Sequence, residues 1–111
     1  MSQYGHETAS RFQRTAVTCV AGSWTKLEGS TPLANRTFIE VFNKGAAASV
    51  KLYLTMTYDG TTPSGDSAAV QYSKAIEVGS FHMEPCGPGI TLWGRTGATT
   101  ARVIVTEYAA G

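Results

Sequence analysis

The chain has 111 residues, of which only 15% are charged, and its formal net charge at pH 7 is +1. This length corresponds to one domain, and 42% hydrophobic residues are enough for a core rather than a disordered chain. A charge near zero argues against binding to a nucleic-acid backbone, which needs an excess of Lys and Arg. No run of about 18 apolar residues is present, so no segment is expected to span a membrane.

The first 12 residues are polar and aperiodic and predict an N-terminal arm, which precedes a single domain over residues 13–111. The arm contains no apolar stretch of the kind found in a secretory signal peptide. The predicted strands of the domain span residues 13–21, 24–28, 36–42, 49–58, 69–72, 74–83, 90–95 and 101–108.

Two turns and two strands have recognisable local features. Gly22 and Ser23 predict a two-residue hairpin turn that joins the first two strands, since Gly accepts a positive φ. Large side chains at almost every position of 36–42 indicate a strand covered on both faces. A bulge is expected at Gly79, where it would bend the strand over 74–83. The Pro/Gly-rich segment 85–89 predicts a tight turn.

The strand over 49–58 has the clearest alternation in the chain. One face is expected to be buried and carries Val50, Leu52, Leu54 and Met56, and the other carries Lys51, Tyr53, Thr55 and Thr57.

About eight short strands at this spacing predict an all-β protein, an antiparallel β-sandwich with jelly-roll-like topology. An immunoglobulin-like sandwich is the alternative, but Trp24 follows Cys19 by only five residues, which fits its Cys–Trp–Cys pattern poorly. Cys19 and Cys86 are expected to be free thiols, with one disulfide as the alternative. The 15 threonines suit either the solvent face of a sheet or a low-charge surface that a partner covers.

The residues give no support for an enzyme, so no catalytic residue, cofactor or small-molecule substrate is expected. His6 lies in the polar arm, and a Cys86–His82 pair lacks a third group to orient it. His82, Glu84 and Cys86 have the i, i+2, i+4 spacing of ligands on one strand face, but an edge strand entering a turn is favoured over a metal site. Asp59 and Asp66 bracket a polar loop whose spacing matches no EF-hand.

Two further groups of residues are candidates for binding. Arg11 and Arg14 flank Phe12, which is too small a basic cluster for a nucleic-acid groove but suits a protein contact. A sugar-stacking face is the alternative, although core or sheet-rim positions are favoured for the two tryptophans. Its aromatic side chains would be Trp24, Trp93, Tyr53, Tyr58, Tyr72 and Tyr108.

Two segments resemble small β-domains of tailed-phage virions. These are TPLANRTFIEVFNKG (31–45), with a Pro-containing loop, Asn-Arg, an apolar strand and Asn-x-Gly, and the closing strand ARVIVTEYA (101–109). Together with length and β-pattern, they make the chain similar to the capsid decoration, or staple, proteins of short-tailed enterobacterial phages of the epsilon15 type.

The resemblance implies a structural virion protein, made in the bacterial cytoplasm and located on the capsid exterior. It would bind the major capsid protein, bridge neighbouring subunits and stabilise the shell against the pressure of packaged DNA, as a homodimer on two-fold positions. Nucleic acid and membrane are not expected partners. We expect the capsid contacts to include Tyr4, Arg11, Phe12 and Arg14, with the arm ordering on binding.

Overall fold

The computed structural model describes residues 11–29, 31–45, 50–58, 60–63 and 74–109. These residues form eight strands: β1 (Arg11–Cys19), β2 (Thr25–Lys26), β3 (Arg36–Gly45), β4 (Leu52–Tyr58), β5 (Lys74–Ile76), β6 (Phe81–Pro85), β7 (Ile90–Thr96) and β8 (Ala101–Ala109). The predicted strand over 69–72, Asp59 and Asp66 lie outside the described residues, as do His6 and Tyr4 of the arm. A helical membrane span is absent from the part of the chain that is described.

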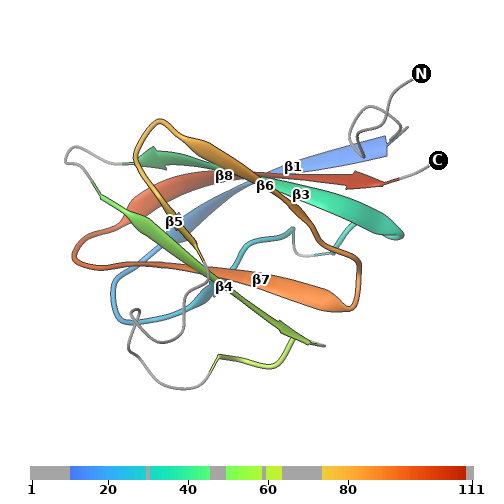
Figure 1. Cartoon of the computed structure of the whole chain (residues 1–111), viewed down its shortest axis with the longest axis horizontal. Helices are drawn as coiled ribbons and strands as arrows, with labels where there is room; N and C mark the ends of the chain where they lie inside the picture. The colour runs from blue at the N-terminus through green and yellow to red at the C-terminus, as the bar shows by residue number, and fades with distance from the viewer. Residues whose placement is uncertain (1–10, 30, 46–49, 59, 64–73, 110–111) are drawn as a thin grey trace.

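Two antiparallel four-stranded sheets pack against each other (Figure 1). Sheet A has the order β1-β8-β3-β6 and sheet B the order β2-β7-β4-β5. The first strand therefore pairs with the last, the second with the seventh, the third with the sixth and the fourth with the fifth. This nested pairing of eight strands over two sheets is the jelly-roll arrangement, which confirms the predicted fold class.

The connections differ from those predicted at two glycines. Gly22 has the expected positive φ of 82°, but the segment it turns leads from β1 in sheet A to β2 in sheet B. The predicted hairpin is therefore wrong, because β1 uses all nine of its residues to pair with β8. Gly79 has a φ of 83° and lies in a turn between β5 and β6, which belong to different sheets, so the predicted single bent strand is also wrong.

The core lies between the sheets and is filled by alternate residues of the central strands. Ile39 and Val41 of β3 and Val103 and Val105 of β8 face residues of sheet B such as Leu52. Both cysteines are buried and free, as predicted. Burial raises the pKa of Cys19 to about 12, so its thiol remains protonated at neutral pH.

The alternation predicted for β4 holds for its first residues and fails at its end. Leu52 and Leu54 are buried, but Met56 is 39% exposed, because it lies in an open groove of about 220 Å³ with Pro85 and Ile90. Thr55, expected on the exposed face, is buried where it pairs with Trp93 of β7.

A buried ion pair joins the loops to sheet A. Arg36 Nη1 lies 2.9 Å from Glu107 Oε1 and 3.2 Å from Glu28 Oε1, and Arg36 and Glu107 are almost completely shielded from solvent. The guanidinium also donates to the carbonyls of Cys86, Gly87 and Ile90. Every charge in this cluster has partners, so we interpret the cluster as structural.

Candidate functional site

The outer face of sheet A carries mostly apolar side chains. Residues of β3 and β8 that point away from the core alternate with the buried Ile39, Val41, Val103 and Val105. The strand register places the outward side chains in three rows across β1, β8, β3 and β6, namely Phe12, Tyr108, Phe38 and Pro85, then Arg14, Thr106, Glu40 and Met83, then Ala16, Ile104, Phe42 and Phe81. We call this set the aromatic face.

Two phenylalanines at opposite edges of the aromatic face are exposed to solvent. Phe12 on β1 is 62% exposed and Phe81 on β6 is 64% exposed. Both strands form the edges of sheet A, and the two central strands hold the residues between them. Exposed apolar side chains that cluster on a rigid sheet are typical of a binding surface.

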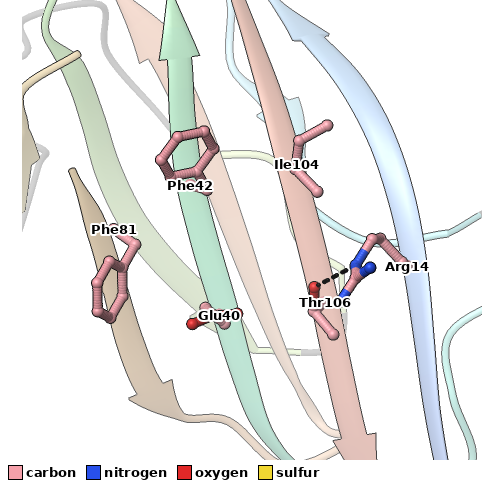
Figure 2. Close-up of a pocket in the computed structure, with 6 residues that line it drawn as sticks. All are labelled: Arg14, Glu40, Phe42, Phe81, Ile104 and Thr106. Atoms are coloured by element: carbon pink, nitrogen blue, oxygen red, sulfur yellow. Dashed lines mark hydrogen bonds between the residues drawn. The ribbon is translucent and has the colours of Figure 1, made fainter. Parts of the chain in front are cut away.

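A shallow groove of about 250 Å³ lies within this face (Figure 2). Phe42 and Phe81 line one side of it, Ile104 and Thr106 lie on the central strand β8, and Glu40 and Arg14 complete the lining. The groove is therefore apolar toward one end of the strands and carries one cation and one anion toward the other.

The polar residues of the middle row are held by neighbours on the same face. Arg14 Nε donates to Thr106 Oγ1 at 3.2 Å, and the guanidinium lies 5.6 Å from the centre of the Phe12 ring. The Tyr108 hydroxyl donates to Glu40 Oε1 at 3.4 Å. Burial and the negative charge of Glu40 raise the pKa of Tyr108, so the phenol stays protonated and remains a donor.

The capsid contacts expected from sequence are separated by the fold. Phe12 and Arg14 lie on the aromatic face, whereas Arg11 has the opposite orientation and donates from Nη2 to the Ala34 carbonyl at 2.9 Å. Strand β1 begins at Arg11, two residues before the predicted start at Gln13. Tyr4 cannot be placed, since it belongs to the residues that are not described.

Sequence reasoning missed Phe81 and Ile104 as members of this face. The signal in the sequence is the strand over 36–42, where two of the outward side chains, Phe38 and Phe42, are large and apolar. The pattern predicts a strand covered on both faces, whereas Phe38 and Phe42 are only partly buried.

The residues considered for catalysis or metal binding do not form one group. His82 Nε2 lies 2.6 Å from Glu84 Oε1 on edge strand β6. Cys86 is buried instead beside Arg36 Nη2 and the Ile90 carbonyl, at 3.6 and 3.5 Å from its sulfur. Burial raises the pKa of Cys86 although Arg36 opposes the shift, so the thiol is not activated as a nucleophile. Within the described ranges no group of three His, Cys, Asp or Glu residues could hold a metal ion.

The tryptophans considered for sugar stacking lie on the outer face of sheet B. Trp93 is 5% exposed, its Nε1 donates to Thr57 Oγ1 at 2.8 Å, and the Lys26 ammonium lies 5.7 Å from its ring centre. The ring is buried and is not an open platform for a sugar, in line with the favoured interpretation. Tyr58 on β4, at 73% exposed, is the most solvent-accessible of the large hydrophobic side chains that are described.

Comparison with protein-family models, with curated proteins and with solved structures finds no match.

Proposed function

We propose that this protein is a structural virion component that binds the outside of an icosahedral phage capsid through the aromatic face. The observation that carries the proposal is the pair of exposed side chains, Phe12 and Phe81, on the two edge strands of a sheet whose outer face is mostly apolar. The exposed area of Phe12 and Phe81 is removed from water only when a partner covers this face, so its apolar surface favours binding.

The chemistry of the face fits a protein surface better than a nucleic acid or a small anion. Arg14 and Glu40 lie in the same row and their charges cancel, and the surrounding positions are aromatic or aliphatic. Interfaces between proteins are depleted of charge at their centres and enriched in aromatic residues and Arg. The resemblance to phage decoration proteins supplies the identity of the partner, the major capsid protein.

Weak binding per copy is sufficient for this role. A specific interface usually buries about 1,200–2,000 Å² of surface. A smaller interface can still give a high overall affinity when one protein contacts two neighbouring capsid subunits, because the second contact is then intramolecular. A homodimer on a two-fold position would contact both subunits equivalently. In this proposal the domain bridges subunits and resists their separation under internal DNA pressure.

Co-sedimentation with capsids that lack this protein tests the proposal. The wild-type protein is expected to pellet with the shells and to raise their melting temperature. Replacing Phe12 and Phe81 together with Ser should weaken binding at least tenfold, since burial of each Phe side chain contributes about 1.5–3 kcal/mol.

Tyr58→Ser is the matched control, because Tyr58 is an equally exposed aromatic residue on sheet B. It should leave capsid binding unchanged. The proposal is wrong if the wild-type protein stays in the supernatant, and the aromatic face is the wrong surface if Tyr58→Ser weakens binding as much as the double variant.

A further inference from the structure

A second unusual arrangement lies on the opposite side of the sandwich, on the outer face of sheet B. Arg95 of β7 pairs with Tyr53 of β4, and its guanidinium carbon lies 5.3 Å from the centre of the Trp24 ring. Arg95 is only 8% exposed. A positive charge is therefore largely removed from water and placed against an aromatic ring.

The donors of this group lack acceptors in the described structure. Arg95 Nε and Nη1 are buried without a hydrogen-bond partner, and so is Nε1 of the adjacent Trp24. Arg36 in the same fold is also buried, but it donates to two carboxylates and three backbone carbonyls. Buried polar donors are normally satisfied, so these two charged donors and the adjacent indole N–H point to an acceptor that the described residues do not supply.

We propose that Arg95 and Trp24 form a recognition site for a carboxylate. The unpartnered atoms of Arg95 and Trp24 are all donors, so the group they recognise must be an acceptor, and the full positive charge of Arg95 favours an anion. A carboxylate carries one negative charge and matches a single guanidinium. A phosphate dianion carries twice the charge of this guanidinium, and its removal from water costs more free energy.

The surroundings of Arg95 also suit an anion. Lys26 lies on the same outer face, next to Trp93 in the β2–β7 register, and no carboxylate among the described residues forms an ion pair with Lys26 or Arg95. Lys51, which immediately precedes β4, differs from Lys26 and Arg95, because it forms an ion pair with Glu77 at 3.6 Å. The positive charges of Arg95 and Lys26 on this face would raise the local concentration of an incoming anion.

The two tryptophans make a direct test by NMR, because the chain contains only two indole N–H groups. Acetate is titrated into the ¹⁵N-labelled protein at constant ionic strength, with chloride and inorganic phosphate in parallel. We expect a saturable shift of the Trp24 indole N–H signal with acetate. The Trp93 signal should stay in place, because its N–H already donates to Thr57.

Two variants assign the effect to Arg95. Arg95→Gln should weaken acetate binding about tenfold or more, since a hydrogen bond to a charged group is lost. Trp93→Phe, which removes the satisfied indole, should leave acetate binding unchanged. If Arg95→Gln does not fold, Trp24→Phe replaces it, with the Arg95 Nε–H signal as the reporter and a weakened acetate response as the expected result.

The carboxylate site is contradicted if acetate moves neither reporter signal, if chloride or phosphate moves it equally, or if the shift persists unchanged in Arg95→Gln. None of these results depends on capsid binding, which uses the other sheet.

Discussion

The guanidinium of Arg36 lies 2.9 Å from the carboxylate of Glu107, and both side chains are shielded from solvent. The two residues are on the neighbouring strands β3 and β8 of sheet A. Glu107 also accepts hydrogen bonds from the backbone N–H groups of Gly29 and Leu33 and from Gln13 Nε2. One carboxylate thus ties the connection between β2 and β3 to strands β1, β3 and β8 of sheet A.

We expect Glu107→Ala to destabilise the fold by about 3–5 kcal/mol, because it leaves a buried guanidinium and several donors without their main acceptor. Urea unfolding followed by tryptophan fluorescence measures the change. Glu77→Ala is the control, since Glu77 forms a solvent-exposed pair with Lys51, and it should change stability by less than about 1 kcal/mol. Equal losses for the two variants would contradict the structural role of the buried pair.

The same cluster predicts how stability depends on pH. Burial would raise the pKa of Glu107, but the hydrogen bonds from Leu33, Gln13, Gly29 and Arg36 outweigh it, and the pKa lies below its ordinary value. A carboxyl whose pKa is lowered by folding stabilises the protein above the ordinary pKa of Glu, about 4.3, and this contribution is lost as the pH falls toward the folded-state value. Stability should therefore fall in acid, and Glu107→Gln should flatten the fall. An unchanged acid dependence in Glu107→Gln would show that other carboxyls cause it.

The strands were predictable from sequence because their signal is local. The alternation at Leu52 and Leu54 and the Val-rich run around Val103 reflect burial of every second residue, which needs no knowledge of the partner strand. The pairing of β1 with β8 joins residues near opposite ends of the chain, such as Phe12 and Tyr108. No local pattern in the sequence encodes this pairing.

The sequence also does not distinguish a turn that joins two paired strands of one sheet from a turn that leads from one sheet to the other. Gly22 adopts a positive φ in either case, so the glycine alone does not tell which strand the chain pairs with next. The candidate site was found only in part. Phe12 and Arg14 can be recognised as a candidate contact because they lie two residues apart in the sequence. Phe81 lies on the same face only because β6 pairs with β3, which places it opposite Phe42.

Gly94 is required where the two sheets approach each other. A Cβ atom at this position would lie 3.1 Å from Cys19 Sγ and from Leu27 Cδ1, and 3.2 Å from Leu52 Cδ1. We expect Gly94→Ala to destabilise the protein by about 1–3 kcal/mol through overpacking. Gly89→Ala is the matched control, because a Cβ there would meet no atom within 4 Å. Thermal unfolding compares the two, and a Gly94→Ala variant as stable as Gly89→Ala would contradict this packing.

The two thiols should be inert in the folded protein. Cys19 is completely buried with a pKa of about 12, and burial also raises the pKa of Cys86, so little thiolate is present at pH 8. We expect iodoacetamide to label neither cysteine of the native protein within an hour and to label both in denaturant, as measured by intact mass. Replacing Tyr58, an exposed residue, with Cys provides an internal control for labelling, since its thiol should react within minutes. Rapid native labelling of Cys19 would mean that the sandwich opens at the β1 end of the core far more often than this packing allows.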